Sequence, residues 1–152
     1  MEKELLEKIK EIRSKVKDTL IVRPLREDDW DTLVSWWKDW PNWENPPKGF
    51  LPDNGTGGLM IEKNSKPIVA GFLYQTNSDA VLFEWVVSDS KYRENDRQEA
   101  IELLIKEAEN TCKDWGYNHM FTIGRTRKLI ETHRKMGWLV DDRSSHEITK
   151  NL

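Results

Sequence analysis

The sequence predicts an α/β (α+β) domain with a mixed central sheet flanked by helices and an extra amphipathic helix at the N-terminus. A chain of 152 residues that is 37% hydrophobic can bury one sizeable core. Apolar residues recur with helical and strand periods in alternation along most of the chain, but three strand-like segments follow one another directly between residues 58 and 89. We expect an accessory helix over residues 1–19 and one domain over residues 20–152.

Charge and composition exclude several classes of protein. The formal net charge is −3, so the basic surface typical of nucleic-acid binding is absent and we expect no nucleic-acid partner. No apolar run reaches the roughly 18 residues of a membrane span, and the charged N-terminal stretch is not a signal peptide, so we expect a cytoplasmic protein. Cys112 is the one cysteine, and the histidines lack partners at metal-ligand spacing, so we expect neither a disulfide nor a metal site.

Residues 2–18 predict a helix, because Leu5, Ile9, Ile12 and Val16 recur at spacings of four and three. Its other faces carry glutamate and lysine. Two arrangements are open: the helix covers the domain's own core, or it pairs with a second helix in a coiled coil and forms a homodimer. We favour the first, because about two and a half heptads are short for a coiled coil.

The next segments predict a strand, a helix and a long loop. Residues 19–25 have the β-branched content of a strand, and a helix then starts near Asp28 or Asp29 with apolar residues at helical spacing. Residues 41–58 hold four prolines and four glycines, which predict a loop and not a regular element. A loop of this length in a compact domain usually carries function.

The rest of the chain predicts an antiparallel meander followed by alternating helices and strands. The helix over residues 97–115 has a continuous apolar stripe, and glycines stand where two helices should end. The predicted elements are strands over 58–64, 67–77 and 80–89, a helix over 97–115 ending at Gly116, a strand over 118–124, a helix over 126–136 ending at Gly137, and strand segments over 138–142 and 144–151.

Three segments of the second half carry a resemblance to a known family: AVLFEWVVS, YRENDRQEAIELLIKEA and LIETHRKMGW. Together with the order of elements, they resemble the GNAT superfamily of N-acetyltransferases, from the strand containing Ile21 to Arg23 onward. The segments LVSWWKDW, FLPDNGTGG and GFLYQTNS resemble small GNAT-like proteins of bacteriophages and environmental bacteria. The resemblance implies that acetyl-coenzyme A (acetyl-CoA) sits in a V-shaped opening between the fourth and fifth strands. It also implies that the acetyl group is transferred to a primary amine.

The resemblance also implies a cofactor-binding loop before the helix over 97–115. The family's pyrophosphate loop reads Gln/Arg-x-x-Gly-x-Gly/Ala, and its glycines let helix N-terminal N–H groups approach the diphosphate. Here the loop runs from Arg93 to Gln98, and Asp96 and Gln98 replace the glycines. Arginines can bond phosphate, and Asn95 or Asp96 can cap the helix; the alternative is an ordinary capped helix start with charge pairs. The implied cofactor-binding residues are Trp85, Val86, Val87, Arg93, Asn95, Asp96, Arg97, Gln98 and Thr126.

Glu84 is the candidate for the general base that acetyl transfer to an amine needs. It lies between two aromatic residues, whose apolar bulk would raise its pKa. Period-two alternation places Glu84 with Leu82 and Val86 on one face of the sheet, and Phe83, Trp85 and Val87 on the other. Glu84 therefore faces either the substrate cleft or solvent, and a glutamate on an exposed sheet face is the alternative.

His133 takes the place of a tyrosine that the family commonly uses to protonate the leaving thiolate. The family segment reads Leu-Tyr-Glu-Lys-x-Gly-Phe, and the matching stretch here runs from Thr132 to Trp138. An imidazole can donate a proton near neutral pH, so the role can survive this replacement. The alternative is a surface histidine beside Arg134 and Lys135.

Four of the eight tryptophans lie in the segment that forms one wall of the acceptor pocket in the resembled fold. Tryptophan faces attract ammonium groups and nucleobases, so we expect Trp36, Trp40 and Trp43, together with Tyr74, to contact a small-molecule or peptide amine. Trp37 fits the core face of the helix, and Trp36 fits either core or cleft. Trp40 and Trp43 can instead pack together to order the loop.

Two other functions belong to different classes. A catalytically degenerate GNAT-fold protein that holds a ligand or a partner protein in the cleft would explain the glycine-free loop. A GNAT-like enzyme that modifies a nucleobase or a nucleic-acid-linked amine would suit the aromatic cluster but gains nothing from the acidic net charge. The sequence therefore favours an acetyl-CoA-dependent N-acetyltransferase with an unidentified acceptor.

Overall fold

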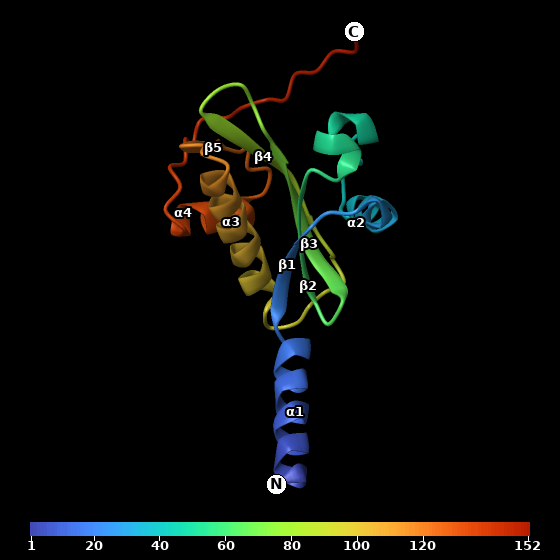
Figure 1. The fold of residues 1–152 in the computed structure, drawn as a ribbon. Helices are drawn as coiled ribbons and strands as arrows, with labels where there is room; N and C mark the ends of the chain where they lie inside the picture. The colour runs from blue at the N-terminus through green and yellow to red at the C-terminus, as the bar shows by residue number, and fades with distance from the viewer.

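The computed structural model describes the backbone of residues 1–152 and all side chains except those of residues 14–17. A five-stranded sheet in the order β1-β2-β3-β4-β5 forms the centre of the molecule (Figure 1). The strands are β1 (Leu20–Pro24), β2 (Gly58–Lys63), β3 (Lys66–Tyr74), β4 (Ala80–Ser88) and β5 (His119–Phe121). β1 to β4 pair antiparallel and β5 pairs parallel to β4, which confirms the mixed sheet and the predicted meander.

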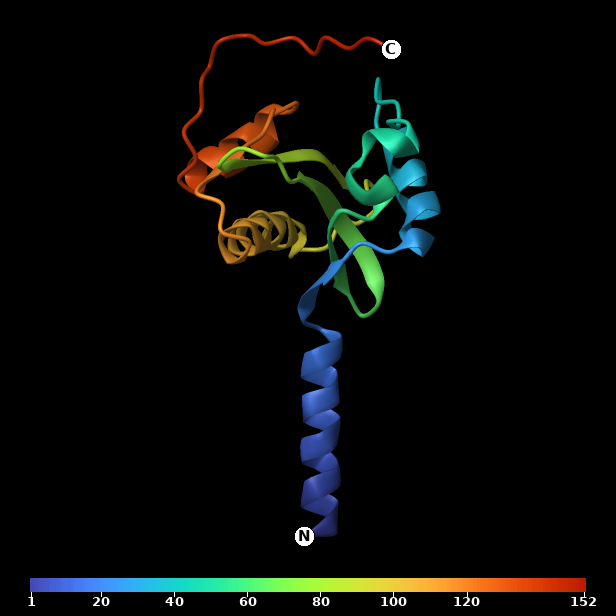
Figure 2. The ribbon, with the colours of Figure 1, turned by 45° about the horizontal axis from the view of Figure 1, so that its top comes forward.

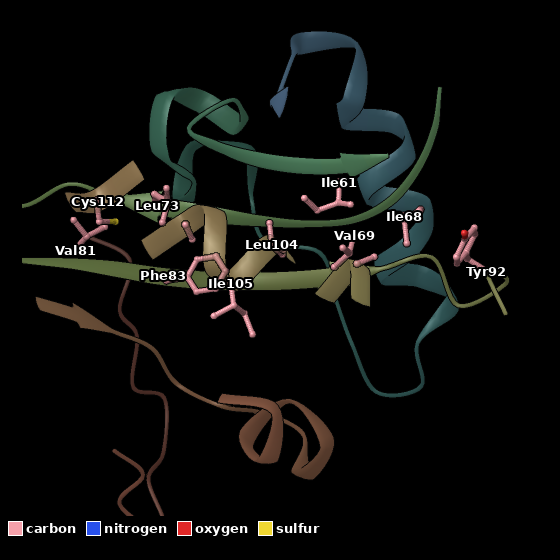
Figure 3. Packing of buried hydrophobic residues seen from close by; sticks show 12 residues of the cluster. Ile61, Ile68, Val69, Leu73, Val81, Phe83, Tyr92, Leu104, Ile105 and Cys112 are labelled. Atoms are coloured by element: carbon pink, nitrogen blue, oxygen red, sulfur yellow. The ribbon is translucent and has the colours of Figure 1, made fainter. Parts of the chain in front are cut away.

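Helices cover both faces of the sheet (Figure 2). The helices are α1 (Glu2–Lys17), α2 (Trp30–Asp39), α3 (Arg97–Asp114) and α4 (Arg127–Lys135), with 3₁₀ turns at Glu27–Asp29, Lys48–Phe50 and Pro52–Gly55. Between α3 and the sheet lies an apolar cluster that includes Val69, Phe83 and Leu104 (Figure 3). On the other face, Trp37 and Phe72 belong to a second cluster under α2. The predicted α/β class is confirmed.

The predicted ends of two helices are also confirmed. After α3, Gly116 has φ +92°, its N–H donates to Lys113 O at 2.9 Å, and the N–H of Tyr117 donates to Cys112 O at 3.0 Å. This pair of bonds is a Schellman motif, which needs a left-handed residue that glycine adopts without steric cost. Gly137 ends α4 in the same way, with φ +93°. These stops are local, so the sequence alone predicts them.

The first helix forms as predicted, but the favoured arrangement, in which it covers the domain's core, is wrong. α1 projects away from the sheet (Figures 1 and 2), and Leu5 and Ile12 are exposed. The link between Lys17 and Leu20 is two residues long, which leaves no chain for a return to the sheet. The side chain of Val16 lies outside the described residues. In the part of the chain that the structure describes, no helix is long and apolar enough to cross a membrane.

The two strand segments predicted over residues 138–142 and 144–151 do not form. The chain after α4 is extended without ladder partners, and Leu139 and Ile148 are exposed. A strand is stable when it pairs along an edge and buries one face, and β-propensity alone provides neither. The C-terminal segment instead runs as an extended chain across the top of the domain, from α4 toward the side of α2 (Figure 2).

Arg23 joins β1 to the turn before α2 and to β2. Its guanidinium donates to both carboxylate oxygens of Asp29, at 2.8 and 2.9 Å, and to Glu62 Oε2 at 2.8 Å. The side chains of Arg23 and Asp29 are largely buried. Burial acts to raise the pKa of Asp29, but the hydrogen bonds from Arg23 and from the Arg26 N–H outweigh it and lower the pKa. This network fixes the start of α2 against the sheet.

We expect Arg23→Ala to destabilise the fold by about 3–5 kcal/mol, because Asp29 and Glu62 would keep their charges in a largely buried place without the guanidinium that pairs with both. The free energy of urea unfolding measures this loss. Arg26→Ala is the matched control, since the ion pair of Arg26 with Asp28 is exposed and should cost at most about 1 kcal/mol. Equal losses in the two variants would contradict the role of the buried network.

Candidate active site

β4 carries one residue more than β3 in the middle of their pairing. Phe72 of β3 pairs with Glu84 of β4, and Ala70 of β3 pairs with Val87 of β4. A step of two residues along β3 therefore corresponds to a step of three residues along β4. Trp85 within this interval has φ +59°, a left-handed conformation that a non-glycine residue rarely adopts. The arrangement is a β-bulge, which bends the strand and leaves a residue out of the ladder.

The bulge reverses the side-chain alternation of β4, so the period-two prediction is wrong beyond Glu84. Val86 packs with Phe83 in the cluster under α3, although it was expected to share the face of Glu84. Trp85 and Val87 pack in the cluster under α2, although they were expected on the face of Phe83. One extra residue in a pleated strand moves every following side chain to the opposite face.

Glu84 lies where β4 and β5 part. The parallel pairing ends at Leu82 and Phe121, and beyond it the carboxylate of Glu84 joins the two segments. Its Oε1 accepts the Ile123 N–H at 2.8 Å, and its Oε2 accepts from Arg125 Nη1 at 3.1 Å. The Glu84 side chain is 11% exposed. A side chain therefore replaces the backbone ladder at the opening of the sheet.

The surroundings of Glu84 suit a proton acceptor. Burial raises the pKa of Glu84 above its ordinary value, and the hydrogen bonds from Arg125 and the Ile123 N–H offset only part of this rise. A carboxyl group whose pKa lies closer to neutral pH accepts a proton more effectively than an ordinary glutamate.

A cavity of about 1160 Å³ lies over the opening, and Glu84 is part of its wall. The wall combines the proline-rich loop after α2, parts of β3, β4 and β5, the segment leading into α4, and the C-terminal segment. Its aromatic members are Trp43, Phe50, Tyr74, Trp85 and Phe121. Among the described residues, no group of three or more His, Cys, Asp or Glu side chains is placed to hold a metal ion.

Of the four residues predicted to bind the acceptor, Trp43 and Tyr74 line this cavity. Trp36 and Trp40 do not, which corrects their predicted role. Trp36 is 4% exposed and belongs to the core under α2. Trp40 follows the last residue of the helix, and its Nε1 donates to Ser88 O at 2.9 Å. Trp40 therefore fastens the end of α2 to the end of β4.

Arg97 holds the loop after β4 together. Its Nη1 donates to the carbonyl oxygens of Asp89 and Tyr92, each at 2.6 Å, and its Nη2 donates to Ser88 Oγ at 2.7 Å. The guanidinium also lies 5.9 Å from the centre of the Trp40 ring. These contacts use the arginine within the protein, so they indicate a positioning residue and not the predicted phosphate ligand.

Asp96 occupies the N-cap position of α3, but its side chain does not cap the helix. Its Oδ1 accepts from the Tyr92 hydroxyl at 2.6 Å and its Oδ2 from Lys63 Nζ at 2.9 Å. The hydrogen bond from Tyr92, followed by that from Lys63, lowers the pKa of Asp96. Arg93 and Asn95 are exposed on the same loop. The loop thus offsets the charge of Asp96 internally and presents Arg93 to solvent.

Two further residues predicted to contact the cofactor serve α4. Gln98 Nε2 donates to Thr132 Oγ1 at 3.1 Å, which ties α3 to α4. Thr126 is the N-cap of α4, and its Oγ1 accepts the Leu129 N–H at 3.2 Å. Neither residue is part of the cavity wall.

His133 is buried, at 3% exposure, so the alternative of a surface histidine is wrong. Its Nδ1 lies 2.9 Å from Leu129 O, and its ring meets the Trp138 ring edge-on at 4.7 Å between centroids. Burial lowers the pKa of His133. The residue is also absent from the cavity wall, so the structure does not bring it together with Glu84. The helical spacing of Leu129, His133 and Met136 is the signal that could have placed it inside.

Arg125 is the site residue that the sequence analysis missed. It bonds Glu84, and its guanidinium carbon lies 4.9 Å from the centre of the Trp85 ring. The available signal was an arginine directly after the strand predicted over residues 118–124. Because parallel strands end at the same edge of a sheet, this cation could be expected beside a carboxylate late in the neighbouring strand.

Comparisons with known proteins identify the fold. No family model matches the chain, and no curated protein matches its sequence. An aminoglycoside acetyltransferase from an uncultured soil metagenomic sample, in complex with trehalose, superposes with a TM-score of 0.61 at 12% identity, over 88% of this chain and 97% of that chain. A possible acetyltransferase from Clostridium difficile 630 superposes with a TM-score of 0.65 at 18% identity, over 89% of this chain and 100% of that chain. N-acetylglutamate synthase from Neisseria gonorrhoeae, complexed with coenzyme A and L-arginine, superposes with a TM-score of 0.66 at 10% identity, over 82% of this chain and 28% of that chain. The chain therefore has the GNAT acetyltransferase fold that the resemblance implied.

We expect Gly71→Ala to destabilise the protein by about 1–3 kcal/mol, because there is no space for a side chain opposite the bulge. A Cβ at Gly71 would lie 2.6 Å from Phe83 Cε1 and 3.3 Å from Val86 Cγ2. Urea unfolding measures the loss, and Gly49→Ala is the control because its Cβ would meet no atom within 4 Å. An unchanged stability of Gly71→Ala would show that the close approach does not constrain β4.

Proposed function

We propose that the chain is an N-acetyltransferase of the GNAT superfamily that moves an acetyl group from acetyl-CoA to a primary amine. The observation that carries the proposal is the place of Glu84, a buried carboxyl group on the cavity wall at the point where β4 and β5 part. The fold supports it, since proteins of this fold include an aminoglycoside acetyltransferase and an N-acetylglutamate synthase complexed with coenzyme A.

The residues around the opening fit a coenzyme A thioester. The bulge takes backbone groups of Trp85 and Val86 out of the regular pairing with β3, and such groups can bond an extended chain that carries amides. The first turn of α3 leaves backbone N–H groups that favour a diphosphate, and Arg93 and Asn95 are exposed beside it. When bound, acetyl-CoA supplies the activated acetyl group.

Glu84 accepts the proton that the amine loses. Each of its carboxylate oxygens accepts one hydrogen bond from the protein, from the Ile123 N–H and from Arg125, so lone pairs remain for an amine. The amine nitrogen forms a bond to the acetyl carbon while the bond from that carbon to sulfur breaks. The sulfur leaves as a thiolate and takes a proton from solvent, because His133 lies outside the cavity wall.

Ligand binding without catalysis is the second candidate function, and the glycine-free loop favours it. Side chains at positions 96 and 98 would crowd a diphosphate if they faced it. In the structure, Asp96 is bonded to Lys63 and Tyr92, and Gln98 is bonded to Thr132. Both side chains are thus engaged with other parts of the protein, which is why we favour the catalytic function.

Acetyl-CoA should bind the purified protein, and isothermal titration calorimetry measures the affinity. Arg93→Ala should weaken binding about tenfold, because one charge-assisted hydrogen bond to phosphate is lost. Lys106→Ala removes an exposed cation from the middle of α3, away from that loop, and should leave the affinity unchanged. Absence of binding at millimolar acetyl-CoA would refute the proposal and would favour the second candidate function.

We expect Glu84→Gln to lower kcat/KM for the amine by about 10²-fold or more, while the affinity for acetyl-CoA is kept. In the wild type, activity should fall as the pH drops through the pKa of Glu84, which burial places above its ordinary value. The variant should lack this acidic limb, as a pH series of thiol release would show. Glu131→Gln, exposed on α4, is the control. A pH profile that is the same in Glu84→Gln and the wild type would rule out Glu84 as the base.

A further inference from the structure

We infer that the acceptor is an α-amino acid with an apolar or aromatic side chain, whose carboxylate binds Arg125 in the place that Glu147 takes in this structure. The inference rests on the proposed function, because it names the substrate class of the same cavity. It is drawn from three features: the two carboxylates on Arg125, the weak attachment of the segment that carries Glu147, and the aromatic wall around them.

Arg125 presents two hydrogen-bonding edges to two different carboxylates. Nη1 donates to Glu84, which is fixed in the sheet, and Nη2 donates to Glu147 of the C-terminal segment. The guanidinium plane is held against the Trp85 ring, at 4.9 Å from its centre. Arginine recognises carboxylates through such parallel donors. The cavity therefore contains a cation that is already in place, with one carboxylate from the sheet, Glu84, and one from the C-terminal segment, Glu147.

Glu147 is attached weakly enough to be displaced. It lies in an extended segment without helix or strand, its side chain is 46% exposed, and its neighbour Ile148 is 93% exposed. In the described part of the chain, its pair with Arg125 is the one ion pair that ties residues 144–152 to the domain. An exposed ion pair of this kind contributes about 0–1 kcal/mol. A free carboxylate that binds together with other groups can replace it.

The adjacency of Glu84 and Arg125 selects the class of acceptor. Their side chains are in direct contact, with 3.1 Å between Nη1 and Oε2. An α-amino acid carries its amine and its carboxylate on one carbon, so its amine can reach Glu84 while its carboxylate binds the free edge of Arg125. A simple alkylamine would offer nothing to that edge, and a peptide N-terminus has an amide where the carboxylate would be.

The wall of the cavity indicates an apolar or aromatic side chain. Trp43, Phe50 and Trp85 line it, and Phe50 meets Trp85 edge-on at 6.4 Å between ring centroids. The Tyr74 hydroxyl donates to Phe50 O at 2.9 Å and so holds this part of the loop against β3. Aromatic walls favour apolar and aromatic groups by burial and by edge-to-face contact.

The first test compares three probes that share a phenyl group and a primary amine: L-phenylalanine, L-phenylalaninamide and 2-phenylethylamine. Thiol release from acetyl-CoA is followed at several pH values, so that differences in amine protonation are separated from recognition. We expect kcat/KM for L-phenylalanine to exceed that for the other two probes by about tenfold or more, the loss that a missing charge-assisted pair causes. Equal values for the three probes would overturn the inference.

The second test changes the two partners of the proposed carboxylate. Arg125→Gln should reduce the preference for L-phenylalanine over 2-phenylethylamine toward one, a ratio that a general loss of activity would not move. Glu147→Gln should lower KM for L-phenylalanine about two- to fivefold, because the competing carboxylate is removed. Asp142→Asn is the matched control. Asp142 also follows α4 and pairs with an arginine, Arg134 of α4, at 3.0 Å, but it is not part of the cavity wall.

The outcomes separate this inference from the proposed function. If acetyl-CoA does not bind in calorimetry, the proposed function fails, and calorimetric binding of L-phenylalanine against 2-phenylethylamine still tests the carboxylate site. If acetyl-CoA binds but none of the three probes is acetylated, or if Arg125→Gln keeps the preference, the inference fails and the proposed function stands. A preference for L-phenylalanine that Arg125→Gln abolishes supports both.

Discussion

Strand β4 carries one residue too many for its partner, and the left-handed backbone of Trp85 absorbs it opposite a glycine that has no room for a side chain. The rest of the site depends on this irregularity. Before it, Glu84 faces the cavity; after it, Trp85 and Val87 stay on the same side of the sheet. A regular strand would have turned Trp85 into the cluster under α3, and Arg125 would have lost the aromatic surface against which it lies.

Glu84 joins β4 to the segment after β5 at the place where the sheet opens, and in the proposed function the same side chain accepts a proton. Its carboxylate accepts the Ile123 N–H where the backbone hydrogen bonds between β4 and β5 have ended. Burial of the same carboxyl group raises the pKa of Glu84. The hydrogen bond from Arg125 acts to lower the pKa of Glu84, but burial has the larger effect. A stabilising contact between two strands and a proton acceptor for catalysis are therefore compatible in one side chain.

The tryptophans divide by their tertiary contacts. Trp36 and Trp37 fill the core under α2, and Trp40 binds the backbone at the end of β4, where Arg97 organises the following loop. Trp43 reaches the cavity. Trp40 and Arg97 thus connect the end of α2, the end of β4 and the loop before α3. Of these four tryptophans, Trp43 lines the cavity, and the other three lie in or against the core under α2.

The sequence by itself determined the order of elements through α4, the meander, the helix ends at Gly116 and Gly137 and the candidacy of Glu84, because periodicity, capping and strand content are local properties of a chain. The tertiary structure decided what depends on partners distant in sequence. It inverted the faces of β4 through pairing with β3, buried His133, left residues 138–151 without a strand partner, and joined Arg125 to Glu84. A strand's register, a side chain's burial and an ion pair across two strands are each set by the other segment involved, which no local pattern contains.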